Sequence, residues 1–173
     1  DENKYYPVTI KMDDTTRPYT INVERSLWAT GKPSWSTHAG GFSVMCRWRS
    51  NGNGWGTIAV QRTILEYDYQ FSTVVPVGSI GQMGNSSNEY VYVRGGSKYN
   101  VIVEGKTGID IILHTAAYTI SEQTIDIKTE VTRPQVTLNK VKTDLENRIT
   151  TVETNFEIRE GQISSKVTEA TVA

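Results

Sequence analysis

The sequence has few of the residues on which many protein functions depend. Its one cysteine, Cys46, excludes an intrachain disulfide framework and a four-cysteine zinc site. Its two histidines, His38 and His114, have no carboxylate cluster at metal-ligand spacing beside them, so we expect no metal and no other cofactor. No apolar run approaches the roughly 18 residues of a membrane-spanning helix, so we predict no membrane insertion.

The chain also lacks an excess of either charge. Lysine and arginine together number 18, and aspartate and glutamate number 19, which gives a formal net charge of -1. A protein that binds the phosphate backbone of a nucleic acid usually carries a basic excess or a basic patch. We therefore expect no nucleic-acid partner.

The motifs of common enzyme classes are missing as well. The sequence has no Gly-x-Ser-x-Gly nucleophile elbow, no phosphate-binding glycine loop and no His-Glu-x-x-His metal motif. A glycoside hydrolase can nevertheless pair two carboxylates that are distant in sequence. The carboxylates left open for such a pair are Glu66, Asp68, Glu89, Glu104 and Asp110. No pattern distinguishes any of them, and we predict that the chain is not an enzyme.

What the sequence does contain is a series of short alternating stretches. Residues 42–49 are the clearest, with apolar side chains at even positions and mostly polar ones at odd positions. Other predicted strands cover 5–12, 19–23, 65–71, 90–94, 99–104, 109–114, 115–120 and 124–129. The glycine-rich turn 50–54 predicts a hairpin with a return strand at 55–60. Residues 74–88 are rich in Gly, Ser and Asn, so no strand is predicted there, and the stretch ends in a candidate exposed loop at 84–88.

This spacing of strands predicts a mainly β fold. Strands that recur every 8 to 12 residues without an intervening helical period are typical of an antiparallel β-sandwich. We expect about nine or ten strands in a jelly-roll-like arrangement at 1–133, ending at the strand-breaking run Thr132-Arg133-Pro134. Cys46 is then expected to be a buried apolar residue, and a reactive thiol is the alternative.

Two tryptophans lie in a predicted loop, which suggests a carbohydrate site. Sugars often stack their apolar faces on aromatic rings while polar side chains bind the hydroxyls. The candidate glycan-binding residues are Trp28, Trp35, Arg49, Asn51 and Asn53. The alternative is that the loop tryptophans fold back as plugs of the core.

The last quarter of the sequence has a different period. Its apolar residues recur at steps of three, four or seven, which predicts an α-helical stripe. We predict a C-terminal coiled-coil stalk at 134–173, parallel and trimeric, because a lone helix with Gly161 and many threonines would not be stable in water. The residues predicted to form this oligomer are Leu138, Val141, Leu145, Arg148, Ile149, Val152, Glu153, Phe156, Ile163 and Val167. Packing of the stripe on the chain's own sandwich is the alternative.

Five segments carry a resemblance to a known family. They are YPVTI from Tyr6, WSTHAGGFS from Trp35, WRSNGNGWG from Trp48, YVYVRGG from Tyr90 and ETNFEIREGQISSKV from Glu153. The first four resemble a β-rich module of tail fibre or tail-tip proteins of bacteriophages and prophages, particularly those of gut bacteria. The last is similar to coiled-coil linkers of phage minor structural proteins. The resemblance implies a trimeric component of the virion tail, assembled in the host cytoplasm and working outside the cell, and it supplies no catalytic residues.

From the stripe and the resemblance together, we expect a structural and receptor-binding segment of a trimeric phage tail fibre. Its partners would be further copies of itself and a host cell-surface glycan or protein. Because the chain begins at Asp1 and its apolar pattern continues to Val172, we expect it to be a piece of a longer protein. One alternative is a carbohydrate-binding module of a larger enzyme or adhesin, with the helix as a linker. A tail-associated hydrolase is the other.

Overall fold

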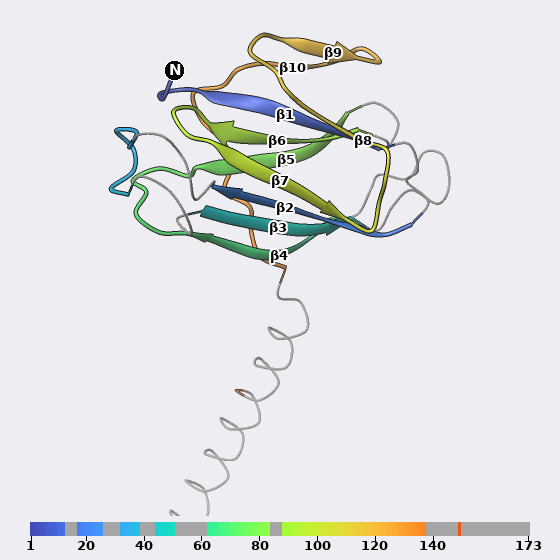
Figure 1. The fold of residues 1–173 in the computed structure, drawn as a ribbon, viewed down its shortest axis with the longest axis horizontal. Helices are drawn as coiled ribbons and strands as arrows, with labels where there is room; N and C mark the ends of the chain where they lie inside the picture. The colour runs from blue at the N-terminus through green and yellow to red at the C-terminus, as the bar shows by residue number, and fades with distance from the viewer. Residues whose placement is uncertain are drawn as a thin grey trace, which may run out of the picture. The chain divides into compact units, whose positions relative to one another are not determined.

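The structure, a computed structural model, describes residues 1–12, 17–25, 32–38, 44–50, 62–83, 88–137 and 149. Ten strands lie in these ranges (Figure 1). They are β1 (Tyr5–Met12), β2 (Tyr19–Arg25), β3 (Val44–Ser50), β4 (Arg62–Tyr69), β5 (Val77–Met83), β6 (Asn88–Arg94), β7 (Tyr99–Glu104), β8 (Ile109–Leu113), β9 (Tyr118–Ile120) and β10 (Gln123–Ile125). The return strand predicted at 55–60 lies outside the described residues.

Eight of the strands form two four-stranded antiparallel sheets. Sheet A has the order β5-β6-β1-β8, and sheet B has the order β4-β3-β2-β7. β9 and β10 pair only with each other, as a small hairpin. The strands β2, β3 and β4 follow one another within sheet B, whereas β7 and β8 belong to different sheets and are the outer strands of each. The predicted antiparallel β-sandwich is therefore confirmed.

The main core lies between the two sheets because alternate residues of each strand point to the same face. Ile10 in β1, Ile21 in β2 and Trp48 in β3 are fully buried in it. Cys46 is also fully buried, and burial raises the pKa of its thiol to about 12. A thiol that is inaccessible and protonated is a packing residue, as the alternation of β3 predicts.

β5 corrects the sequence interpretation of residues 74–88. Gly78, Ser79 and Gly81 read as loop residues, yet they lie in a strand paired with β6. A Cβ on Gly81 would come within 2.2 Å of the Tyr90 ring, so the glycine is required by close packing and not by a turn. The pairing is irregular between Gly78 and Gly81, and Ser79 has a φ of 47°. The strand therefore has a turn-like composition because its neighbours leave no room for larger side chains.

A second, smaller core covers the outer face of sheet A. Tyr5, Met83, Tyr92 and Ile125 are buried together there, under the β9–β10 hairpin. The amide of Tyr5 donates to the carbonyl of Lys128 over 2.8 Å, and the Lys128 amide returns a bond of 3.0 Å. Sheet A is thus packed on both faces.

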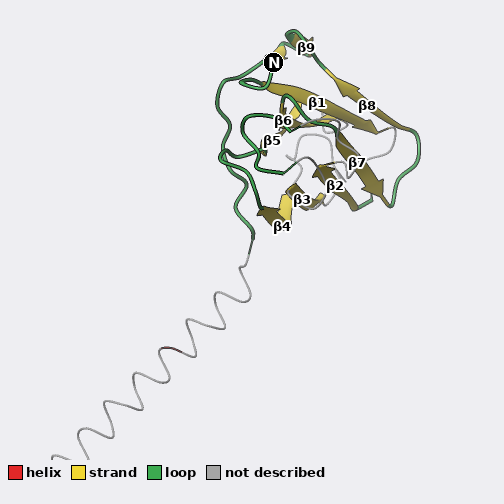
Figure 2. Ribbon diagram, turned by 60° about the vertical axis from the view of Figure 1, so that its left-hand side comes forward, coloured by secondary structure: helices red, strands yellow, loops and turns green. Residues whose placement is uncertain are grey.

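Residues 131–137, which we call the strap, continue from this covered face along one side of the sandwich. The Ser79 amide in β5 donates to the carbonyl of Thr132 over 2.9 Å, and the Thr137 amide donates to the carbonyl of Ile64 in β4 over 2.9 Å. Val136 packs against the main core. The strap therefore crosses from the edge of sheet A to the edge of sheet B, on the side away from β7 and β8 (Figure 2).

The fold class differs from the prediction at the C-terminal part. Of the described residues 59% are in strands and none forms a helical element, so the fold is mainly β and the predicted coiled-coil stalk is wrong. The stalk was placed at 134–173, yet residues 134–137 are extended strap residues. Val136 gains burial in the sandwich core and Thr137 gains a backbone partner in β4, which a helix starting there would forgo. An apolar period shows where a face would lie, but it does not stabilise a helix by itself.

The chain divides into two compact units, Asp1–Thr137 and Leu138–Ala173. The first therefore continues four residues past the boundary expected at Arg133. Of the predicted oligomerisation residues only Ile149 is described, with a side chain 56% exposed. The others, from Leu138 to Val167, lie outside the described residues. Among the described residues, no helix has the length and apolar character needed to cross a membrane.

Candidate functional site

The one described tryptophan of the predicted glycan site is a plug of the sandwich. Trp35 is only 3% exposed, and its indole nitrogen donates to the carbonyl of Gly95 over 2.8 Å. The guanidinium of Arg25 lies 5.1 Å from the centre of its ring. Arg25 is itself buried, and it donates to the hydroxyls of Ser36 and Ser97 over 2.7 Å each. Burial lowers the pKa of this guanidinium. Trp35 therefore has no face left for a sugar.

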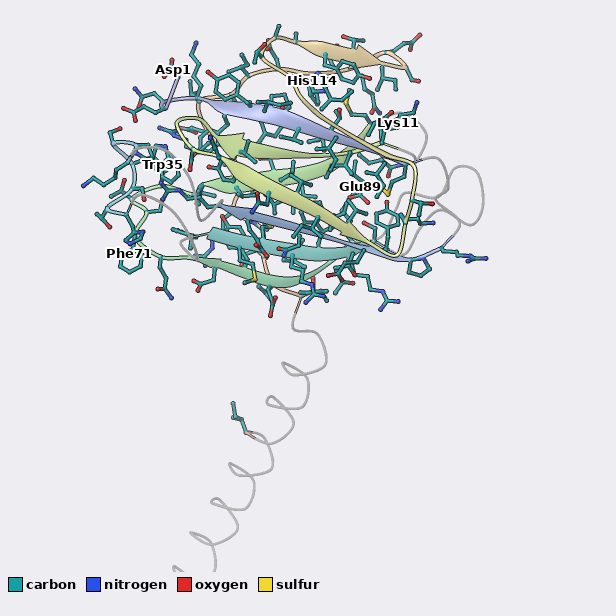
Figure 3. All side chains as sticks on the ribbon, viewed as in Figure 1. Asp1, Lys11, Trp35, Phe71, Glu89 and His114 are labelled. Atoms are coloured by element: carbon teal, nitrogen blue, oxygen red, sulfur yellow. The ribbon has the colours of Figure 1, made fainter. Side chains whose placement is uncertain are left out.

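The two predicted glycan residues that the structure describes, Trp35 and Arg49, lie apart. Trp35 lies at one end of the sandwich, near Phe71, and Glu89 lies toward the opposite end (Figure 3). Arg49 precedes Ser50, whose hydroxyl contacts Glu89, so Arg49 belongs to the opposite end from Trp35. Its side chain is exposed on the outer face of sheet B. Trp28, Asn51 and Asn53 lie outside the described residues.

Among the open carboxylates, Glu89 has an unusual place. It is fully buried in the space between the sheets, and it comes from β6 of sheet A. Its carboxylate accepts hydrogen bonds from four side chains of sheet B. The donors are Tyr19 Oη, Ser50 Oγ, Trp48 Nε1 at 2.9 Å and Arg62 Nε at 2.8 Å.

The environment of Glu89 makes it a clamp between the sheets. Burial, together with the neighbouring carboxylate, raises the pKa of the Tyr19 phenol, which therefore stays protonated and donates. With four donors around two oxygens, the carboxylate has its hydrogen-bonding capacity filled. A substrate cannot reach a side chain with no exposed surface. We call Glu89 and its four donors the clamp.

The other open carboxylates are surface residues. Glu66, Asp68, Glu104 and Asp110 are all exposed. Glu104 forms an ion pair of 3.2 Å with Arg47, which lies on the outer face of sheet B. Among the described residues, no group of three or more His, Cys, Asp or Glu side chains is placed to hold a metal ion.

The feature that sequence reasoning missed is a groove between the outer strands of the two sheets. It has a volume of about 900 Å³, and β7 of sheet B and β8 of sheet A both contribute to its wall. Val8 and Val93 form its floor from the inner face of sheet A, and Tyr99 and Val101 line it from β7. The groove is thus a part of the main core that is open to solvent.

The side chains of β8 that line the groove are half exposed although they face the core. Ile111 is 44% exposed and Leu113 is 55% exposed. Ile111 pairs with Ile10 and Leu113 pairs with Val8, and both partners are buried in the main core. Residues directly opposite each other point to the same face of a sheet. Ile111 and Leu113 therefore point toward sheet B without being covered by it.

The rim of the groove is polar and mainly basic. Lys4 and Lys98 lie on it, together with Asn100 and Thr115. Lys4 lies 4.0 Å from the carboxylate of Asp1, and both side chains are about half exposed, so this pair is weak. The Tyr99 hydroxyl donates to the Arg94 carbonyl over 2.9 Å, and burial raises its pKa. Tyr99 is thereby held as a neutral, apolar wall of the groove.

Comparison of the chain with protein-family models, with curated proteins and with solved structures finds no match in any of the three.

Proposed function

We propose that this chain is a structural and receptor-binding module of a phage tail fibre or tail-tip protein, and that the groove between β7 and β8 holds the receptor. The resemblance of four segments of the sandwich to tail proteins supports the structural part. A β-sandwich packed on both faces of sheet A suits a component that must keep its shape outside the cell. The proposal places the module in the virion tail.

The observation that carries the receptor-binding part is the exposure of core-facing side chains at the groove. Burying an isoleucine or leucine side chain fully is worth roughly 1.5–3 kcal/mol, and Ile111 and Leu113 obtain only part of this. An apolar patch with a polar rim is typical of a binding site for a ligand or a partner. A module that served only as a spacer would gain stability by filling the groove.

Binding to bacterial cells tests the proposal, and the chain offers a matched pair of variants. Ile111 and Ile102 are the same residue type in neighbouring edge strands, 44% and 43% exposed. Ile111 lines the groove, whereas Ile102 pairs with Asn22 on the outer face of sheet B. We expect Ile111→Asp to lower the binding of fluorescently labelled protein to a panel of gut-bacterial strains by about tenfold or more. Ile102→Asp should leave it unchanged.

Two results would reject the groove as the receptor site. One is equal binding by the two variants on every strain that binds the unmodified protein. The other is an unmodified protein that binds no strain. A glycan array with the same pair of variants tests the carbohydrate-binding alternative. In that alternative the protein binds isolated sugars, and binding does not require intact cells of a phage host.

The homo-oligomer expected from the sequence, a trimer in particular, stays a prediction. Linking several weak sites can raise overall binding by about 10² to 10⁴ without new contacts, so a trimer would make a shallow groove effective. Sedimentation equilibrium of the whole chain measures the number of copies directly. A monomer at all concentrations would remove the trimer and leave the groove proposal in place.

A further inference from the structure

We propose that the occupant of the groove is an extended, acidic polypeptide segment that adds to β8 as a further strand of sheet A. This inference rests on the proposed function and names the chemical class of the receptor. It follows from three features of the described residues: the way the opposite side of the sandwich is closed, the free edge of β8, and the charge of the rim.

The strap shows how this fold closes a side of the sandwich. On the β4–β5 side, extended backbone at Thr132 pairs with Ser79 of sheet A, and Thr137 pairs with Ile64 of sheet B. Val136 is partly buried and packs against the main core. The guanidinium of Arg133 lies over two tyrosine rings of β4, 5.4 Å and 5.3 Å from their centres. Backbone pairing, an inserted apolar side chain and a covered aromatic surface together make the closure.

The β7–β8 side has the same requirements, and among the described residues no such segment lies on it. β8 pairs with β1 on one edge only, and β7 pairs with β2 on one edge only. An outer strand leaves half of its backbone groups unpaired, and β8 has no proline and a single charged residue, Asp110, to discourage pairing. Extended peptides commonly bind proteins by adding to such an edge.

The side chains of β8 set the pattern that the added strand needs. Ile111 and Leu113 face the groove, and Ile112 faces the opposite side of sheet A with 49% exposure. A strand beside β8 would place every second side chain in the groove, against Tyr99 and Val101. β8 has five residues, so the segment would be about 17 Å long. Small or branched apolar residues at alternate positions fit these contacts best.

The rim adds a charge requirement. Lys98 and Lys4 lie on it, and Asp1 offsets Lys4 only in part. Complementary charge raises the rate and the specificity of association more than the affinity. Glutamate or aspartate at the solvent-facing positions of the segment would meet these lysines. A sugar fits the floor of the groove less well, because the valine, isoleucine and leucine side chains there offer no groups to bind hydroxyls.

Peptide binding to the whole chain tests the proposal. The probe is an acetylated and amidated peptide of about seven residues in which valine alternates with glutamate. One comparison peptide has lysine in place of glutamate, and another is the acidic peptide N-methylated at alternate residues, which removes donors along one edge. NMR titration of the ¹⁵N-labelled protein reports both the affinity and the amides that are perturbed.

We expect the acidic peptide to perturb amides of Tyr99–Glu104 and Ile109–Leu113 and to bind at least about tenfold more tightly than either comparison peptide. Ile111→Asp should weaken its binding by about tenfold or more, and Ile102→Asp should leave it within about twofold. Lys98→Glu should weaken it too, whereas Arg49→Glu, at an exposed basic residue on the outer face of sheet B, should not.

Several outcomes would overturn the proposal. Equal binding of the N-methylated peptide would mean apolar docking without strand addition. Perturbation of the groove by oligosaccharides but not by the peptides would make the occupant a glycan. Concentration-dependent perturbation of β8 without any peptide would make it a second copy of this chain. In each of these cases, cell binding that is lost with Ile111→Asp would still support the proposed function.

Discussion

The two sides of the sandwich differ in what closes them. On the β4–β5 side, the strap pairs with Ser79 and with Ile64 and inserts Val136 into the core. On the β7–β8 side, core-facing residues such as Leu113 stay half exposed around a groove of about 900 Å³. The sheets and their core are common to both sides. The proposed binding site is therefore the side of the sandwich that no segment of the described residues closes.

The largest expected effect concerns the clamp, because both sides depend on the sheets being held together. Glu89→Gln removes the charge that Arg62 meets and replaces one of the two acceptor oxygens by an NH₂ group that only donates. Breaking one partner of a buried ion pair typically costs about 3–5 kcal/mol. We expect the free energy of unfolding, measured in urea, to fall by about 3 kcal/mol or more.

The control for this experiment is an exposed ion pair of the same type. Glu104→Gln breaks the contact with Arg47, in which the glutamate side chain is 57% exposed, and should cost less than about 1 kcal/mol. If Glu89→Gln cost no more than Glu104→Gln, the clamp would not hold the sheets together.

The next largest expected effect concerns only the β4–β5 side, which the strap closes. A Cβ on Gly78 would come within 2.6 Å of the Thr132 carbonyl oxygen and 2.9 Å of a Val131 methyl group. Gly78→Ala should therefore displace the strap and lower the free energy of unfolding by about 1–3 kcal/mol. Hydrogen exchange should become faster at Thr132 and Thr137, whose amides bond to β5 and β4.

A second variant separates displacement of the strap from general damage to β5. Adding Val131→Ala to Gly78→Ala removes the methyl contact but leaves the clash with the Thr132 oxygen. Part of the lost stability should return in the double variant. No return at all, with normal exchange in the strap, would mean that Gly78 does not seat the strap.

The smallest expected effect is a pH dependence beside the open side. His114 follows β8, its Nε2 lies 2.7 Å from the Thr9 hydroxyl, and its ring stacks on Tyr118 at 4.1 Å between ring centres. Burial lowers the pKa of His114 below its ordinary value of 6.5. The unfolded chain then binds the proton more readily than the folded chain does.

The contribution of His114 to stability is fully present above pH 6.5 and is lost as the pH falls from there toward the lower pKa of the folded state. Thermal unfolding at several pH values should show this loss in the unmodified chain. His114→Gln should reduce this loss. An equal loss in the unmodified chain and in His114→Gln would contradict the assignment to His114.

The strands could be predicted where packing follows a simple period. β3 and β7 alternate because one face of each is buried, and that pattern is visible in the sequence. β5 was missed because Gly78 and Gly81 are needed for close approach to the strap and to Tyr90, contacts that no local pattern reveals. The stalk was predicted from a helical period and a resemblance to coiled-coil linkers, although residues 134–137 find better partners in the sandwich.

The groove and the clamp could not be predicted from the sequence, because they too depend on contacts that no local pattern reveals. The groove depends on which strands end up at the edges, and β7 and β8 are consecutive in the chain but lie in different sheets. The partners of Glu89 lie up to 70 positions away, so no spacing could identify it as a clamp. Trp35 sits in loop-like sequence but is buried by Arg25 and Gly95, which only the folded chain brings to it.

Amide hydrogen exchange of the unmodified chain tests the contrast between the two sides most directly. We predict slow exchange at Ser79, Thr132 and Thr137 on the strap side, because each amide has a bonded partner there. Alternate amides of Ile109–Leu113, which face away from β1, should exchange fast and become protected when the acidic peptide is added. Slow exchange along both edges of β8 in the free protein, or fast exchange throughout the strap, would contradict the account.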